Sequence, residues 1–152
     1  MPRPVNVKIT REIPMPVPQA FAWLTDFQDD DAQRAGAVVA RRKVVERSAT
    51  RSVYEGETEV LGRRNPATTE VRLHPPDAWE ARVVAGPRTG SWTTYKLTPS
   101  GTGSRLALHY RFTHEKPMTR VLMRLVKPKI RAELVKMWEG YEADMRREIA
   151  KA

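Results

Sequence analysis

The chain has 152 residues, with 27 lysines and arginines against 18 aspartates and glutamates, which gives a formal net charge of +9 at pH 7. It contains no cysteine, which excludes disulfides, thiolate metal sites and cysteine nucleophiles. The proportions of hydrophobic residues (40%) and charged residues (30%) are those of an ordinary globular domain. The excess of positive charge favours an anionic partner, such as nucleic acid, a membrane surface or an acidic ligand.

The sequence carries no sign of a targeting or membrane-spanning segment. No apolar run approaches the roughly 18–20 residues that a spanning helix needs. The first residues lack the apolar stretch of a signal peptide. Together with the absence of cysteine, this predicts a cytoplasmic protein. The length, without repeats or low-complexity segments, predicts one domain over residues 1–152.

The N-terminal part predicts a strand followed by short helices. Apolar and polar residues alternate over residues 5–13, as in a half-buried strand. Prolines at positions 14, 16 and 18 end this strand, and Pro18 can serve as the first residue of a short helix over residues 19–24. Residues 29–36, which end at Gly36, are interpreted as a second short helix or a loop.

Residues 37–113 predict an antiparallel meander of about six strands, because turn signals recur about every 8–12 residues. The expected turns lie at residues 48–51, 62–66, 74–77, 86–90 and 99–103. Within the strands polar residues alternate with apolar ones, so one face of the sheet is expected to be covered and the other to face water. Arg41, Arg42 and Lys43 place charge on both faces of one strand, which predicts a bulge or an edge strand.

The C-terminal part predicts a long helix. Apolar residues recur at every third or fourth position from Ile130 to Ile149, which gives a helix with one apolar stripe. The preceding residues 118–127 have a helical pattern of their own. Since Pro128 lies between the two patterns, we predict a kink or break there, with residues 118–129 forming a distinct helix.

This order of elements resembles the START-like superfamily, also called SRPBCC. The resemblance begins at residues 13–27 (IPMPVPQAFAWLTDF), which are similar to the strand–proline–helix opening of that superfamily, and continues at residues 91–99 (SWTTYKLTP) and 103–106 (GSRL). It implies an α+β helix-grip fold: a seven-stranded curved antiparallel sheet wrapped around the long C-terminal helix, with two short helices after the first strand. The run Asp29-Asp30-Asp31 departs from the family's pattern, which commonly has a turn with proline or tryptophan there.

The resemblance also implies a cavity between the sheet and the long helix that binds a small hydrophobic or amphipathic ligand, such as a lipid, isoprenoid, quinone or aromatic polyketide-like molecule. The alternation of each strand predicts which side chains line it. These are Tyr54, Thr58, Val71, Leu73, Trp79, Val83, Thr93, Tyr95, Leu108, Tyr110 and Phe112 from the sheet, and Leu134, Trp138 and Tyr141 from the helix. The alternative is that these side chains fill a dry core.

A second function is open, since the resemblance includes cyclases and dehydratases that use a tyrosine with an arginine. In that case Tyr110 or Tyr95 would be the general acid or base. Arg42 or Arg72 would orient a carbonyl, although strict alternation points Arg72 away from the cavity. We otherwise expect no catalytic residue and no cofactor.

The three histidines do not predict a metal site. His74, His109 and His114 lack metal-binding spacing and have no accompanying cluster of carboxylates. We therefore expect no bound metal.

The last candidate is a basic segment. Residues 116–131 hold six basic residues and no acidic one. As a helix, this segment would place Arg120, Arg124 and Lys127 on one stripe facing an anionic membrane. Its apolar residues Val121, Leu122 and Leu125 would point to the sheet rim or the cavity mouth, so that the helix acts as a portal flap.

Other interpretations of the basic segment are also open. It can be an ordinary solvated helix face, or a surface through which a regulatory protein binds another protein. The sequence lacks the recognition helix or the aromatic-plus-basic sheet that would specify nucleic-acid binding, which argues against nucleic acid as a partner.

Overall fold

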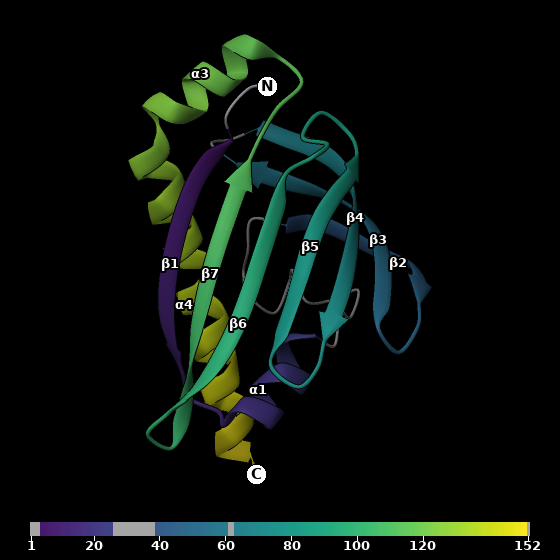
Figure 1. Cartoon of the computed structure of the whole chain (residues 1–152). Coiled ribbons are helices and arrows are strands. Elements are labelled where there is room, and N and C mark those ends of the chain that lie inside the picture. The colour runs from purple at the N-terminus through teal and green to yellow at the C-terminus, as the bar shows by residue number, and fades with distance from the viewer. Residues whose placement is uncertain (1–3, 26–38, 61–62, 152) are drawn as a thin grey trace.

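Seven antiparallel strands form one sheet that curves around a long C-terminal helix in the computed structural model (Figure 1). The structure describes residues 4–25, 39–60 and 63–151. The strand order is β1-β7-β6-β5-β4-β3-β2, so a single pairing, β1 with β7, joins strands that are far apart in the sequence.

Most elements follow from the alternation and helical periodicity of the sequence. The strands are β1 (Val5–Ile13), β2 (Val39–Arg47), β3 (Arg51–Val60), β4 (Arg63–His74), β5 (Ala78–Ala85), β6 (Trp92–Ser100) and β7 (Gly103–Phe112). The helices are α1 (Val17–Leu24), α3 (Pro117–Leu125) and α4 (Lys127–Lys151). These elements confirm the predicted fold class. The predicted second short helix, at residues 29–36, lies outside the described residues.

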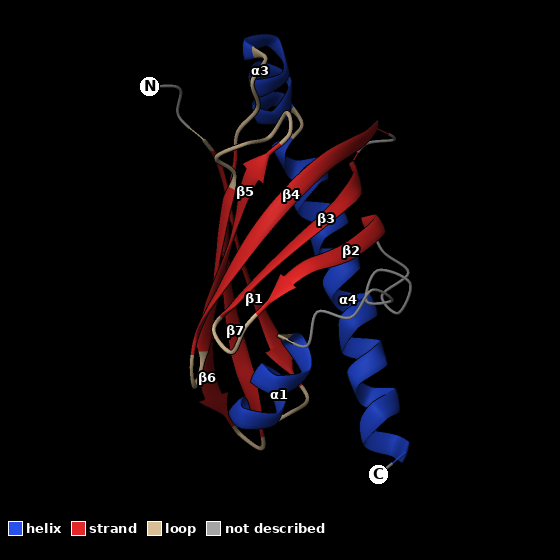
Figure 2. Cartoon of the chain, turned by 90° about the vertical axis from the view of Figure 1, so that its right-hand side faces the viewer, coloured by secondary structure: helices blue, strands red, loops and turns tan. Residues whose placement is uncertain are grey.

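The helices are placed at distinct parts of the sheet. Figure 2 shows α4 running along one face of the sheet, with α1 at one end of the molecule and α3 at the opposite end. The apolar residues of β1 and β7 share one face of the sheet, because odd-numbered residues of β1 pair with even-numbered residues of β7, as in Val7 with Tyr110 and Ile9 with Leu108. This face is turned toward α4, since its residues form one hydrophobic cluster with Trp138 of that helix. The sheet face that holds these pairs is therefore the inner face.

Strand β2 is both an edge strand and a bulged one. It ends the strand order, and its register with β3 shifts between Val39 and Arg41 and again between Val44 and Glu46. The two bulges lie on either side of the Arg41-Arg42-Lys43 run. An irregular, charged edge resists pairing with another chain, so both parts of the prediction for this strand are confirmed.

The turn predicted at residues 62–66 is wrong in its extent. Strand β4 already begins at Arg63 and contains Pro66, which is paired with Glu57 of β3. Proline lacks an N–H and so cannot serve two neighbouring strands. Here the pairing of β4 with β5 ends at Thr68, which leaves Pro66 with β3 alone as its strand neighbour.

The predicted break between the two C-terminal helices is confirmed, but it lies at Val126, so residues 127–129 belong to α4 and not to the helix predicted over residues 118–129. Helix α3 ends at Leu125 and α4 begins at Lys127, with Val126 between them in a non-helical conformation. The carbonyl of Val126 accepts hydrogen bonds from the N–H groups of Lys129 and Ile130, which starts the new helix. Pro128 therefore lies in the first turn of α4, where a missing N–H is tolerated.

The expected direction of the apolar residues of α3 is wrong. Val121, Leu122 and Leu125 are exposed to solvent instead of packing on the sheet rim. The half-buried residues of this helix are Thr119, Arg120 and Met123. The reason is that α3 is held by polar contacts on that other side, described below, and extends beyond the end of the sheet (Figures 1 and 2).

Candidate functional site

Aromatic side chains form a continuous series across the inner face of the sheet. The Trp79 ring of β5 stacks on Tyr95 of β6, with centroids 4.8 Å apart and an interplanar angle of 7°. Tyr95 meets Tyr110 of β7 edge-on at 6.5 Å, and Tyr110 stacks on Phe112 at 5.5 Å. Trp79 and Tyr95 are direct partners in the pairing of β5 with β6, whereas Tyr110 lies diagonally across from Tyr95 on β7 and Phe112 follows two residues further along β7. The contact of Tyr95 with Trp138 shows that the series faces α4.

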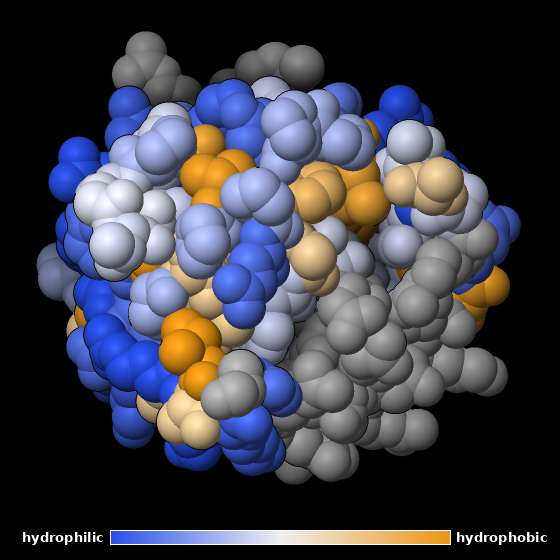
Figure 3. Space-filling view, turned by 90° about the horizontal axis from the view of Figure 1, so that it is seen from below, coloured by the Kyte–Doolittle hydropathy of each residue, from blue (hydrophilic) through white to orange (hydrophobic). Residues whose placement is uncertain are grey.

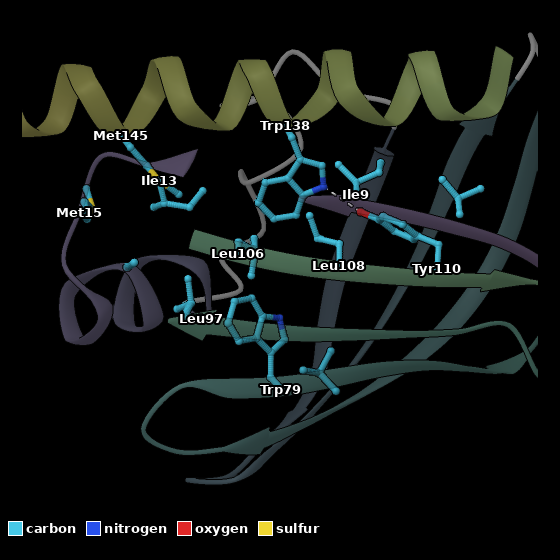
Figure 4. Packing of buried hydrophobic residues seen from close by; sticks show 13 residues of the cluster. Ile9, Ile13, Met15, Trp79, Leu97, Leu106, Leu108, Tyr110, Trp138 and Met145 are labelled. Atoms are coloured by element: carbon cyan, nitrogen blue, oxygen red, sulfur yellow. Dashed lines mark hydrogen bonds between the residues drawn. The ribbon is translucent and has the colours of Figure 1, made fainter. Parts of the chain in front are cut away.

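Helix α4 completes this aromatic cluster. Trp138 is buried, and its Nε1 donates a hydrogen bond of 2.8 Å to Tyr110 Oη (Figure 4). The Trp138 ring also lies 6.4 Å from Tyr95 and 5.1 Å from Tyr141. Trp138 is thus the point at which the helix contacts the aromatic series of the sheet.

The Tyr110 hydroxyl is kept protonated by its surroundings. Burial raises the pKa of Tyr110, and this effect exceeds the opposing effect of the hydrogen bond from Trp138. A phenol with a raised pKa does not serve as a general base near neutral pH. It retains a proton that it can donate to a polar group of a ligand.

The predicted lining residues fall into two groups by burial. Five are buried, namely Val71, Trp79, Leu108, Tyr110 and Trp138. Eight are half-buried, namely Tyr54, Leu73, Val83, Thr93, Tyr95, Phe112, Leu134 and Tyr141. The backbone of Thr58 pairs with Val39 and Asn65. The half-buried group keeps solvent-accessible surface although most of its apolar members pack against the core.

Arg88 is a site residue that the sequence interpretation missed. It lies in the loop between β5 and β6, and its Nε is buried from solvent. Burial lowers the pKa of Arg88 and the neighbouring Tyr54 raises it, so the guanidinium is largely withdrawn from water and lies near that hydroxyl. The segment Gly86–Gly90 was interpreted only as a turn, and a lone arginine between turn residues gives no periodic signal.

The loop that carries Arg88 is firmly held. The Ser91 N–H donates to the Arg88 carbonyl at 2.9 Å, and the Thr89 N–H donates to Gly86 at 3.1 Å. Gly86 has φ of +108°, and a Cβ there would lie 2.4 Å from the Pro66 carbonyl oxygen, so only glycine fits. The Glu115 N–H donates to Pro87 at 2.8 Å, which joins the loop to the residues before α3.

The two arginines considered from the sequence lie on different strands, Arg42 on β2 and Arg72 on β4. Arg72 is exposed and bonds Glu70 at 2.8 Å, in agreement with its predicted direction away from the cavity. Arg42 has Gly56 as its Cα partner, which settles its register.

A charged pair inside the helix–sheet interface was also missed. Arg11 of β1 bonds Glu142 of α4 through two hydrogen bonds, of 2.7 Å and 2.8 Å. The side chains are 23% and 7% exposed, and the hydrogen bond to Glu142 raises the pKa of Arg11. Arg11 occupies an inner-face position of its strand, where alternation alone predicts an apolar residue.

The described part of the chain holds no group of three or more histidine, aspartate or glutamate side chains placed to bind a metal ion. His109 and His114 instead make local contacts, with Asn6 and with the Lys116 N–H respectively. Within the same residues no helix has the length and apolar character needed to span a bilayer.

A curved antiparallel sheet gripping a long C-terminal helix, with an aromatic inner face, defines a START-like helix-grip protein. The family model described as polyketide cyclase / dehydrase and lipid transport matches residues 4–142, and the chain belongs to that family.

Solved structures agree with this fold. The protein TTHA0849 from Thermus thermophilus is similar, with a TM-score of 0.79 and 17% identity over 95% of this chain and 99% of that one. The Zhui aromatase/cyclase from Streptomyces sp. R1128 has a TM-score of 0.77 and 14% identity over 95% of each chain. A START superfamily protein from Mycobacterium smegmatis has a TM-score of 0.74 and 15% identity over 92% of this chain and 98% of that one. No curated protein sequence matches the chain.

Proposed function

We propose that this protein binds a small hydrophobic or amphipathic molecule between the inner face of the sheet and α4. The observation that carries the proposal is the half-buried aromatic group, in which Tyr54, Tyr95, Phe112 and Tyr141 keep accessible surface although they face the interior. Burial of apolar ligand surface would supply most of the affinity, at about 25 cal/mol per Å². A lipid, isoprenoid, quinone or aromatic polyketide-like molecule has the required character.

Polar groups at one end of this site would orient the ligand. Arg88 lies near Tyr54, and Tyr110 retains a hydroxyl proton because its pKa is raised. These groups suit a ligand with a carbonyl or acidic group at one end. The other predicted lining residues would contribute apolar contact.

A substitution that fills the site tests the proposal. Ala81 lies on the inner face, where its Cα partners are Val71 and Thr93, and it is half-buried. If there is a ligand space, Ala81→Phe fills it, so the variant stays folded and loses binding of the apolar fluorophore N-phenyl-1-naphthylamine. The control is Ala107→Phe on the exposed face of β7, which should bind like the wild type.

The same variant also tests the dry-core alternative. In a closely packed interior, a phenylalanine at position 81 would be overpacked and would destabilise the fold by about 1–3 kcal/mol. An unchanged fluorophore affinity in Ala81→Phe, or a wild-type protein that binds none, contradicts the proposal. If the wild type binds the fluorophore, extraction of the purified protein followed by mass spectrometry would identify the chemical class of its natural ligand.

A second candidate function is that of a cyclase or dehydratase without a cofactor. Arg88 beside Tyr54 favours it, because a buried cation near a phenol can polarise a carbonyl while the phenol moves a proton. Tyr54 joins Tyr110 and Tyr95 as a candidate for the acid. Incubation with linear poly-β-keto thioesters, followed by detection of cyclised products that have lost water, tests this function. Wild-type protein that yields none rejects it for those substrates.

Other expectations from the sequence stay predictions: a single domain over residues 1–152, a cytoplasmic location, the absence of a nucleic-acid partner, and α3 as a flap at the entrance. The bond between Glu115 and Pro87 supports the last one, because it joins the start of α3 to the loop of Arg88.

A further inference from the structure

Helix α3 turns its apolar side to solvent. Its large apolar residues Met118, Val121, Leu122 and Leu125 are 82%, 51%, 44% and 76% exposed. At 100° per residue, these four positions lie on one side of the helix. No residue of α3 is buried. An exposed apolar face of this kind on one helix marks an interaction surface.

The orientation of α3 is fixed by contacts on its other side. Thr119, Arg120 and Met123 are half-buried, and Arg120 Nη1 donates a hydrogen bond of 2.7 Å to the His114 carbonyl. Arg120 is therefore an anchor of the helix, not part of a freely exposed basic stripe. This corrects the expected role of one member of the trio with Arg124 and Lys127.

Basic residues flank α3 in the sequence at both of its ends. The stretch from residue 116 to residue 131 has no acidic residue, and Lys116, Lys127 and Lys129 are exposed. The helix lies at one end of the molecule, beyond the sheet (Figures 1 and 2). The opposite end differs: among the described residues of that face, apolar side chains form small patches separated by hydrophilic ones (Figure 3).

We infer that α3 is a membrane-docking helix whose four apolar residues enter the interfacial layer of an anionic bilayer. Exposed lysines at both ends of a helix with an exposed apolar face match the two chemistries of such a surface, acyl chains and anionic headgroups. A nucleic acid would leave the apolar side unused. A second copy of the chain would bring two clusters of the same charge together. The inference does not depend on whether a ligand binds between sheet and α4.

Vesicle co-sedimentation tests the apolar part. The variant Met118→Gln/Leu125→Gln keeps good helix-forming residues while removing the two most exposed apolar side chains. We expect it to bind vesicles of phosphatidylcholine and phosphatidylglycerol about tenfold more weakly than the wild type. Val45→Thr/Val84→Thr, which changes exposed valines of the sheet, should bind like the wild type. Equal binding by all three proteins overturns the inference.

A charge-matched pair of variants tests the basic part. Lys127→Glu/Lys129→Glu places acidic residues in the first turn of α4, where they favour the helix, so lost binding is not caused by unfolding. We expect roughly a fivefold weakening for each lysine changed. The control Arg146→Glu/Lys151→Glu changes the same amount of charge at the far end of α4 and should bind nearly as well as the wild type. Equal losses in both variants would mean that overall charge, not this surface, attracts the vesicles.

Labelling distinguishes insertion from surface attraction. Because the chain has no cysteine, Leu125→Cys and Thr98→Cys each accept one environment-sensitive nitrobenzoxadiazole fluorophore. Anionic vesicles should shift the emission of the Leu125→Cys probe to the blue and leave the Thr98→Cys probe unchanged. A bound protein without this shift contradicts insertion. Failure to bind vesicles together with concentration-dependent dimers that Met118→Gln/Leu125→Gln abolishes would assign the face to a second copy instead.

Discussion

Trp138 of α4 and Tyr110 of β7 are joined by a buried hydrogen bond in which the indole N–H donates to the phenol oxygen at 2.8 Å. Both residues belong to the main hydrophobic cluster, so this hydrogen bond is a directional interaction within an otherwise apolar contact between α4 and the sheet (Figure 4). Apolar packing alone allows a helix to rotate over a sheet at small energetic cost, whereas a buried donor requires its acceptor. The pair therefore helps to define which side of α4 faces the sheet.

Removing the acceptor should destabilise the protein. Tyr110→Phe leaves the Trp138 N–H buried without its hydrogen bond, which is expected to lower the free energy of unfolding by about 1–3 kcal/mol. Urea denaturation measures the loss. In a Trp138→Phe background the same change should cost less, because no donor remains to be left unsatisfied. Equal losses in the two backgrounds would show that the bond contributes nothing.

Removing one partner of the charged pair Arg11–Glu142 should lower the free energy of unfolding more than replacing both partners. Glu142→Gln removes the charge that balances Arg11 in a mostly buried position, with an expected loss of about 2–4 kcal/mol. The double variant Arg11→Met/Glu142→Leu should lose less than this single variant. The exposed Glu148 on the same helix gives a control, since Glu148→Gln should change stability by only about 0.5 kcal/mol. Urea denaturation of the four proteins checks the order.

The fold could be predicted largely from the sequence because its signals are local. Alternation fixed the bounds of the strand Val5–Ile13, and the change to helical periodicity after Pro117, with Pro128 as a breaker, predicted two C-terminal helices. Pro66 was misassigned because a proline ends a strand only where both sides are paired, and pairing is not visible in the sequence.

The candidate site was only partly predictable. Side chains such as Trp79, Tyr95 and Tyr110 follow the period of their strands, so their common face could be inferred. Arg88 lies in a turn, where no period indicates direction. Arg11 breaks the apolar pattern because its partner, Glu142, lies 131 residues further along the chain. The outward face of α3 depends on the anchor formed by Arg120, which periodicity alone does not reveal.

The stability of the protein should decrease as His109 is protonated. Burial lowers the pKa of His109 below its ordinary value of 6.5, with further lowering by Arg111 and Lys8. A neutral ring with its proton on Nε2 donates to Asn6 Oδ1 at 2.9 Å and accepts from Arg111 at 2.8 Å through Nδ1. Because the unfolded chain binds this proton more readily, the stabilisation of the fold by His109 is complete above the pKa of the unfolded state. It is lost as the pH falls from there through the lower pKa of the folded state.

Two measurements check the behaviour of His109. A nuclear magnetic resonance titration of the ring protons should give a pKa below 6.5, and a value at or above 6.5 would contradict the geometry. The melting temperature should also fall less between about pH 7.5 and pH 5.5 in His109→Gln than in the wild type. The difference is expected to be small, because the ring is only half-buried.

Arg88 should select ligands by the charge of their polar end. A guanidinium that is largely withdrawn from water binds an anion more strongly than a fully hydrated one, because it has lost part of its hydration. The fluorophores N-phenyl-1-naphthylamine and 1-anilinonaphthalene-8-sulfonate share their aromatic rings and differ in a sulfonate. Arg88→Gln keeps a polar side chain of similar length but removes the charge. We expect it to weaken binding of the sulfonate by about tenfold, which corresponds to about 1.4 kcal/mol, and to leave the neutral fluorophore nearly unaffected.

The two fluorophores must also be compared in variants that keep Arg88. Tyr54→Phe removes the hydroxyl near the guanidinium. It should weaken binding of the sulfonate fluorophore less than Arg88→Gln does, because a neutral hydrogen bond contributes less than a charged one. Arg72→Gln changes an exposed arginine of the outer face and should leave both affinities unchanged. Equal weakening of both fluorophores by Arg88→Gln would mean that the residue supports the loop between β5 and β6 and does not contact the ligand. Weaker binding of the sulfonate fluorophore by Arg72→Gln would mean that this probe binds on the outer face of the sheet.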